Sequence, residues 1–323
     1  MNSQATIHVP GKIMLCGEYS ALNGTSVLSS TVDQFAKITV SKADAPTYYS
    51  ELWQGPLDEL ELERNKNQYR PVYDSALFVK QQLRLDKIQI QLENFWPISY
   101  GFGSSSAIRL GILLAANKLL ETPLAEEKIC YEAIMLQRKA QSRSSGYDTA
   151  TQFHGGIIEY KPIRDTFVDS TYKYSQEATH RLNSFAKLAI STTGNETAKQ
   201  INSFTHTLEN SNLWPSLNAL NAALFATWKQ VLTEQASSTK LMPLFAEHRR
   251  LCEEIYPQPL TEALNQTNQI DESWSYKTTG AGGSDALLFV GNVTAEVESI
   301  LENYGWGFYN GAFGANGIRA FRQ

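Results

Sequence analysis

The sequence lacks the features that would place the protein outside the cell or in a membrane. Only three widely spaced cysteines occur among 323 residues, and none forms a Cys-x-x-Cys pair, which argues against a disulfide framework and a structural zinc site. Long apolar runs are missing as well, because the most apolar helical stretch, residues 107–120, contains Arg109 and Asn117. The chain does not open on a basic segment followed by an apolar stretch. We therefore expect a cytoplasmic protein that neither spans nor contacts a membrane.

Excess positive charge and paired histidines are also missing. The formal net charge is -5, with 28 lysines and arginines against 33 aspartates and glutamates, so no nucleic-acid partner is expected. The five histidines show no metal-ligand pairing and receive no chemical role. With 42% hydrophobic residues, a chain of this length can bury a substantial core. The composition is that of an ordinary globular protein.

Three short segments, far apart in the chain, carry the strongest functional signal. They are Pro10-Gly-Lys-Ile-Met-Leu-Cys-Gly-Glu18, Gly101-Phe-Gly-Ser-Ser-Ser-Ala107 and Lys277-Thr-Thr-Gly-Ala-Gly-Gly-Ser-Asp285. The middle segment follows an extended run and precedes an apolar helical pattern, so that free backbone N–H groups can point at one anion. Glycine lets the backbone approach a phosphate, and serine hydroxyls can bind phosphate oxygens or Mg²⁺. We therefore expect the triphosphate of a nucleotide at five positions of this segment: Gly101, Gly103, Ser104, Ser105 and Ser106.

Other glycine-rich signatures fit the middle segment less well. A Walker-A loop is excluded, because no Gly-x-x-x-x-Gly-Lys-Ser/Thr pattern occurs in the chain. A hydrolase nucleophile elbow needs Gly-x-Ser-x-Gly, and the second glycine is missing here. The dinucleotide fingerprint lacks its third glycine and its acidic partner downstream. A plain Gly/Ser turn before a buried helix is the structural alternative.

The pattern along the chain predicts a mixture of helices and strands. Helical periodicity covers about residues 74–85, 107–120 and 125–140, and further helices reach to about residue 267. Residues 41–70 show no clear period and are interpreted as an irregular excursion that holds part of a nucleobase pocket. Residues 142–148 form a polar loop between regular elements, a place where functional residues concentrate. Strands are expected at residues 6–9, 36–40, 88–92, 157–160, 188–190, 286–290 and 317–321.

In this order and spacing, the three segments resemble those of the GHMP kinases, the superfamily of galactokinase, homoserine kinase, mevalonate kinase and phosphomevalonate kinase. The resemblance covers nearly the whole chain and implies an α+β fold. Residues 1–170 would form an N-terminal domain like domain 2 of ribosomal protein S5, and residues 171–323 a C-terminal ferredoxin-like domain whose last strand returns to the first sheet. ATP, Mg²⁺ and a small-molecule substrate are the implied cofactors and partners, and a monomer or homodimer is expected.

The resemblance also implies roles for single residues. Asp148 orients or deprotonates the acceptor, Lys12 stabilises the carboxylate and the developing negative charge, and the Ser105 hydroxyl lies near Mg²⁺. An acceptor that carries a phosphate needs further cations, and Arg143 is the leading candidate. Substrate contacts are expected from a larger set: Glu18, Tyr19, Arg143, Ser145, Gly146, Thr193, Gly194, Lys277, Gly280, Ala281 and Gly282.

The opening motif separates two branches of this superfamily. Gly17-Glu18-Tyr19 is similar to the phosphomevalonate kinase opening, because mevalonate kinases place histidine after the glutamate. We therefore expect 5-phosphomevalonate as the acceptor, with mevalonate as the alternative. Gln137 aligns with the glutamate that binds magnesium in mevalonate kinases, which leaves a catalytically inactive ligand sensor as a further alternative.

Overall fold

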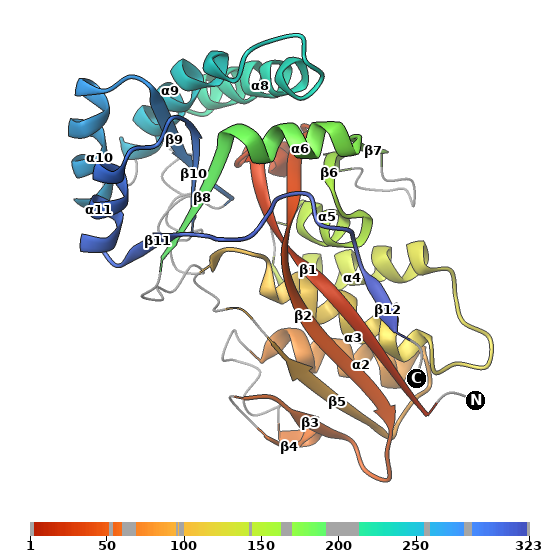
Figure 1. Ribbon diagram of the computed structural model, residues 1–323. Coiled ribbons are helices and arrows are strands. Elements are labelled where there is room, and N and C mark those ends of the chain that lie inside the picture. The colour runs from red at the N-terminus through yellow and green to blue at the C-terminus, as the bar shows by residue number, and fades with distance from the viewer. Residues whose placement is uncertain are drawn as a thin grey trace.

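The computed structural model describes residues 3–51, 54–59, 69–94, 96, 100–141, 144–162, 170–191, 213–254, 259–280 and 286–321. Two sheets organise these residues, a larger one of eight strands and a smaller one of four, and helices lie against both (Figure 1). The predicted α+β class is therefore confirmed. None of the helices in these ranges combines the length and apolar character needed to cross a membrane.

A long antiparallel hairpin, β1 (Gln4–Cys16) and β2 (Val27–Lys42), forms the centre of the larger sheet. The strand order is β12-β1-β2-β5-β3-β4, and β6 pairs with the first half of β2 and with β7. The pairing of β1 with β2 shifts register after Pro10, where proline cannot donate to the ladder. The other strands are β3 (Thr47–Tyr49), β4 (Gln54–Pro56), β5 (Ile88–Glu93), β6 (Ile157–Lys161), β7 (Ser170–Lys173) and β12 (Arg319–Phe321).

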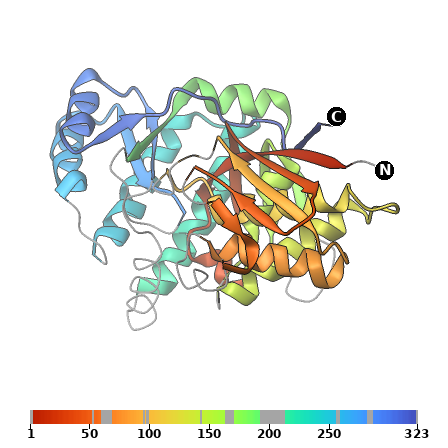
Figure 2. The ribbon, with the colours of Figure 1, turned by 90° about the horizontal axis from the view of Figure 1, so that it is seen from below.

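Helices cover one face of this sheet (Figures 1 and 2). The central one, α3 (Ser104–Asn117), lies on β1 and β2, and α2 (Arg70–Gln82) and α4 (Glu126–Ala140) pack beside it. Every residue of α3 from Ser106 onward is buried, which explains its nearly continuous apolar sequence. A shorter helix, α5 (Tyr147–His154), packs on β1, β2 and β6.

The smaller sheet is antiparallel, with the strand order β11-β8-β10-β9. Its aromatic core includes Trp274, Tyr276 and Phe289, whose ring centroids lie 5.3 to 6.1 Å apart. From β11 the chain returns to the larger sheet, where β12 pairs with β1. The elements of this region are α6 (Gln176–Phe185), β8 (Ala186–Ser191), α8 (Leu213–Leu232), α9 (Leu241–Glu253), α10 (Pro259–Ile270), β9 (Trp274–Thr278), β10 (Ala286–Gly291), α11 (Ala295–Asn303) and β11 (Trp306–Phe308).

Two local expectations differ from the structure. Residues 41–70 are not wholly irregular, because they contain the end of β2 together with β3 and β4; strands of three residues are too short to show a period. Helix α2 begins at Arg70 rather than near residue 74, and Pro71 fits its first turn, where a backbone N–H is not needed.

Candidate active site

The ammonium group of Lys12, in β1, is the centre of the candidate site. Its Nζ donates to the carbonyl oxygen of Gly101 and to the hydroxyl oxygen of Tyr147, both at 3.0 Å, and lies 2.7 Å from Oδ1 of Asp148. All three N–H donors of the ammonium are thereby engaged. Burial alone lowers the pKa of Lys12, but Asp148 and Tyr147 outweigh it, and the pKa is raised. The lysine therefore keeps its positive charge.

Asp148 is held by the start of helix α5. Gly146 precedes the helix with φ of 88°, a left-handed conformation that glycine adopts without strain. The aspartate lies in the first helical turn, where the helix dipole favours a carboxylate, and not in the loop where the sequence pattern put it. Its side chain is 19% exposed, against 7% for Lys12. The carboxylate is thus paired with a cation and still accessible to a substrate.

The Gly101–Ser106 segment forms the turn into α3. Gly103 has φ of 77°, and no side chain caps the helix that follows, so its first backbone N–H groups are available to a ligand. A Cβ atom at Gly103 would lie 2.8 Å from Cε of Lys12, so the close approach of the loop to the lysine requires glycine. Ser106 is buried and donates its hydroxyl to the Gly103 carbonyl at 2.8 Å. Ser104 and Ser105 are only partly buried and keep hydroxyls that a phosphate could reach.

The third glycine segment reaches the same place. A Cβ atom at Gly280 would lie 3.7 Å from the hydroxyl oxygen of Tyr147, which in turn binds Lys12. The structure therefore brings together part of each of the three segments around Lys12 and Asp148. The sequence pattern did not identify Tyr147, whose side chain is buried and whose pKa is raised by burial.

Two residues predicted to contact substrate, Glu18 and Lys277, form a second ion pair. Both side chains are fully buried, and Nε2 of His248 lies 3.6 Å from the other carboxylate oxygen of Glu18. Asn221 of α8 donates to the Glu18 carbonyl at 2.9 Å, which ties this segment to the helices of the smaller sheet. Burial alone raises the pKa of Glu18, but Lys277 and His248 lower it to about 2. Substrate contact by Glu18 or Lys277 stays a prediction.

The remaining predicted residues are held by other contacts or lie elsewhere. Tyr19 is buried with φ of 60° and packs with Leu217 and Cys252. Ser145 is buried, and its carbonyl accepts hydrogen bonds from Arg138 and Tyr160, both at 3.1 Å. Five predicted positions lie outside the described residues: Arg143, Thr193, Gly194, Ala281 and Gly282.

The described part of the protein offers few side chains that could bind Mg²⁺, which suits a metal ion held mainly by the phosphates of a nucleotide. Gln137 is a buried neutral amide whose Oε1 accepts from Thr149 at 3.2 Å. Within the described ranges, no group of three or more His, Cys, Asp and Glu side chains could hold a metal ion. Mg²⁺ commonly takes one or two protein ligands and completes its shell with water and phosphate. The partly buried Ser105 is the one predicted protein ligand, and its role stays a prediction.

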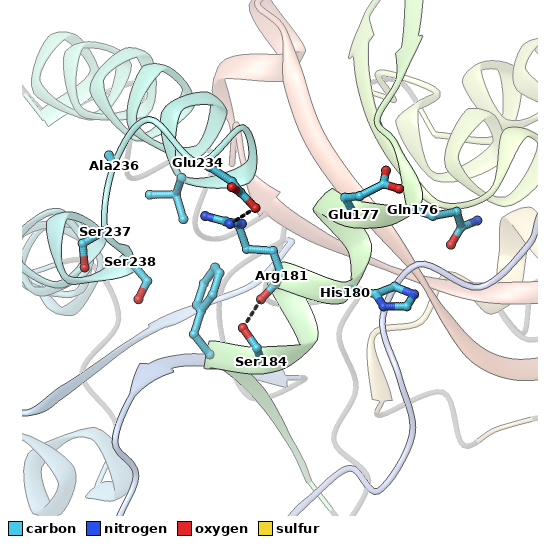
Figure 3. Close-up of a pocket in the computed structure, with 11 residues that line it drawn as sticks. Gln176, Glu177, His180, Arg181, Ser184, Glu234, Ala236, Ser237 and Ser238 are labelled. Atoms are coloured by element: carbon cyan, nitrogen blue, oxygen red, sulfur yellow. Dashed lines mark hydrogen bonds and ion pairs between the residues drawn. The ribbon is translucent and has the colours of Figure 1, made fainter.

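A pocket of about 620 Å³ lies elsewhere, between α6 and the chain that follows α8 (Figure 3). Two of its charged residues, Arg181 and Glu234, pair with each other, and the Ser184 hydroxyl donates to the Arg181 carbonyl at 2.7 Å. None of the residues that line it belongs to the three glycine segments. We therefore place the candidate active site at Lys12 and Asp148 instead, where the glycine segments meet.

Sequence comparison connects this site with a family of kinases. The family model described as "GHMP kinases N terminal domain" matches residues 70–156, which include the Gly101–Ser106 segment and Asp148. The mevalonate kinase of Archaeoglobus fulgidus is 28% identical over 148 residues, which are 46% of this chain and 49% of that protein. A homoserine kinase of Xylella fastidiosa is 28% identical over 137 residues, 42% of each chain. The chain spans about half the length of the curated relatives it matches.

Structural comparison extends the likeness over nearly the whole chain. A crystal structure of a mevalonate kinase superposes with a TM-score of 0.70 at 18% identity and covers 96% of this chain and 99% of its own. The Streptococcus pneumoniae phosphomevalonate kinase in complex with phosphomevalonate and AMPPNP gives a TM-score of 0.71 at 15% identity, covering 95% and 99%. At these identities the comparison establishes the shared fold.

Proposed function

Because the chain belongs to the GHMP kinase superfamily, we propose that it transfers the γ-phosphoryl group of ATP to a small-molecule acceptor, and that this acceptor is mevalonate. The observation that carries the kinase proposal is the pair of Lys12 and Asp148, 2.7 Å apart and next to the Gly101–Ser106 segment. Phosphoryl transfer needs phosphate held by fixed donors, a cation for developing charge and a group that receives the acceptor proton. These residues supply all three.

In the proposed reaction, the backbone N–H groups at the start of α3 and the hydroxyls of Ser104 and Ser105 hold the phosphates of ATP. The acceptor hydroxyl lies against Asp148, which receives its proton as the new O–P bond forms and the bond to ADP breaks. Lys12 holds the carboxylate in place and balances its charge. Mg²⁺, bound by the phosphates and the Ser105 hydroxyl, would neutralise phosphate charge.

The choice of mevalonate over 5-phosphomevalonate reverses the expectation drawn from Gly17-Glu18-Tyr19. The curated relatives that support this choice are mevalonate kinases, whereas the phosphomevalonate kinase matches at the level of fold. In addition, Lys277, a cation among the predicted substrate contacts, is paired with Glu18 and is therefore less suited to bind an acceptor phosphate. 5-Phosphomevalonate is the second candidate, because the Gly17-Glu18-Tyr19 opening favours it.

An ADP-release assay with MgATP and a panel of acceptors tests the proposal. The panel contains mevalonate, 5-phosphomevalonate, L-homoserine and galactose, and a reaction without acceptor gives the background hydrolysis. We expect the highest kcat/KM with mevalonate. A higher kcat/KM with another acceptor refutes the mevalonate assignment but keeps the kinase. Nucleotide binding without turnover on any acceptor instead supports the inactive ligand sensor.

A further inference from the structure

The buried amide of Gln152 joins the candidate base to the proposed nucleotide loop. Gln152 lies on α5, four residues after Asp148 and therefore one helical turn away on the same face. It has no exposed surface, and its Nε2 donates to the carbonyl oxygens of Phe102 at 3.3 Å and Gly103 at 3.1 Å. One helix thus carries both Asp148 and the Gln152 amide that binds the loop.

The carbonyl groups of the loop are all held from the protein side. The Gly101 carbonyl accepts from Nζ of Lys12, and the Phe102 carbonyl accepts from the backbone N–H of Lys12 and from Gln152. The Gly103 carbonyl accepts from Gln152 and from Ser106. In a trans peptide the N–H points opposite to the C=O. The N–H groups of residues 102, 103 and 104 therefore point away from these anchors, toward the side where an anion would lie.

The orientation of the Gln152 amide follows from the same contacts. If the amide were turned over, its oxygen would face two carbonyl oxygens, which cannot donate. With the nitrogen on the loop, Oε1 of Gln152 is buried and has no hydrogen-bond partner among the described residues. A buried unsatisfied oxygen is unfavourable, so core packing alone does not explain a polar residue here. The hydrogen bonds from Gln152 to the loop carbonyls explain why a polar residue is buried here.

We infer that Gln152 is a positioning residue for nucleotide binding, because its amide fixes the loop carbonyls and thereby aims the loop N–H groups at the phosphates. The inference rests on the proposed nucleotide site. The side chains of Lys12 and Gln152 both pack against the loop at Gly103. A Cβ atom at Gly103 would lie 2.8 Å from Cε of Lys12 and 3.3 Å from Nε2 of Gln152. Removing the amide takes one donor from each carbonyl and loosens the loop. The Lys12 N–H still binds the Phe102 carbonyl, the Ser106 hydroxyl and the Ala107 N–H still bind the Gly103 carbonyl, and Asp148 stays in its helix.

Two variants and a matched control test this role. Gln152→Met keeps the shape of the side chain and removes both donors, and Gln152→Glu replaces the donors with oxygens that repel the loop carbonyls. The control is Thr151→Val, because Thr151 is equally buried on α5 and its hydroxyl bonds to Ser29 at 2.6 Å and to the Tyr147 carbonyl at 2.7 Å, away from the loop. Calorimetry measures the Kd of MgATP, and steady-state kinetics measures the acceptor KM.

We expect Gln152→Met to raise the Kd of MgATP about tenfold and Gln152→Glu about a hundredfold, with the acceptor KM changed less than about twofold. Thr151→Val should leave the Kd within about twofold. An unchanged Kd in folded Gln152→Met, or an equal rise in Thr151→Val, overturns the inference. If Gln152→Met does not fold, Gln152→Glu gives the same test. A wild-type protein that binds no MgATP refutes the proposed function itself, which separates the two failures.

Discussion

Two of the lysine–carboxylate pairs among the described residues include a lysine from the glycine segments, and these two pairs differ in their exposure to solvent. Lys12 and Asp148 lie 2.7 Å apart, and the aspartate keeps 19% of its side chain exposed. Lys277 and Glu18 are equally paired, but neither has any exposed surface. Both pairs draw on the glycine segments, so motif membership does not distinguish them. Access to solvent does, because a group that reacts with a small molecule must be reachable.

The surroundings of the two pairs agree with this distinction. Glu18 lies among Lys277 and His248, and its backbone carbonyl is held by Asn221 of the opposite region. This arrangement suits a permanent link between the larger sheet and the helices of the smaller one. The Lys12 ammonium instead holds Asp148 and the Gly101 carbonyl, two groups that border the proposed phosphate site.

The largest expected effect is on turnover, at the Lys12–Asp148 pair, which we call the exposed pair because its aspartate is partly exposed. Asp148→Asn keeps the shape of the side chain and removes the proton acceptor, so kcat should fall about 10³-fold. The free energy of unfolding should also fall, by about 2 kcal/mol, because the buried Lys12 loses its counter-charge but keeps two other acceptors. Asp271→Asn, in a surface turn where Asp271 accepts from Ser273, is the control and should leave kcat unchanged. A kcat within tenfold of wild type would remove Asp148 from the chemistry.

The next largest effect is on stability, at the fully buried Glu18–Lys277 pair, which we call the sealed pair. Glu18→Gln leaves Lys277 buried without a counter-charge, and the free energy of unfolding in urea should fall by about 3 kcal/mol. Adding Lys277→Met should restore part of the loss, because it removes the unpaired charge. Glu298→Gln is the matched control, since Glu298 and Lys187 are 50% exposed and 3.7 Å apart, and it should cost less than about 1 kcal/mol.

The kinetic result of Glu18→Gln tests the comparison directly. The folded fraction should keep its kcat within about tenfold, because neither side chain of the sealed pair has exposed surface. A stable Glu18→Gln protein without turnover would instead show that Glu18 is needed for the reaction. The two pairs would then share one function, as the sequence-based prediction of substrate contact by Glu18 and Lys277 requires.

The elements with strong periodicity could be predicted from the sequence, and the short ones could not. The apolar patterns indicated α3 and α4 within three residues of their starts, because long helices bury a continuous face. Strands β3 and β4 were missed, since three residues carry no period. The helical placement of Asp148 was missed as well. Glycine is typical of loops, and the sequence does not show that Gly146 takes a left-handed conformation directly before helix α5.

The same limit applies to the site. Residue types pointed to the Gly101–Ser106 segment, because phosphate binding needs glycine and serine there, and the resemblance to the GHMP kinases pointed to Lys12 and Asp148. Gln152 gave no signal, since its partners are backbone carbonyls fifty and forty-nine positions away. The pairing of Glu18 with Lys277 spans 259 positions and could not be read from spacing. His248 was given no chemical role, although it and Cys252 are one helical turn apart on α9 and their side chains lie 3.6 Å from each other.

The smallest expected effect is the pH dependence of the stability difference between wild type and Glu18→Gln. The pKa of Glu18 is about 2 in the folded protein against an ordinary 4.5, so the unfolded chain takes up the proton first as the pH falls. The stabilisation from Glu18 is therefore complete above about pH 5 and disappears toward pH 2. About 2 kcal/mol of the difference should be lost by pH 3, a value that follows from the two pKa values.

Other groups near Glu18 do not titrate in this window. Burial lowers the pKa of His248, but Cys252 and Glu18 raise it to about 9, so His248 is protonated in the folded and the unfolded wild type below pH 5. Burial raises the pKa of Cys16, which stays a neutral thiol. Carboxylates elsewhere are common to both proteins and cancel in the difference. Urea unfolding of both proteins from pH 5 to pH 3 measures the effect. A difference that stays constant over this range would mean that the charge of Glu18 does not stabilise the folded protein, and the stabilising role given to the sealed pair would be wrong.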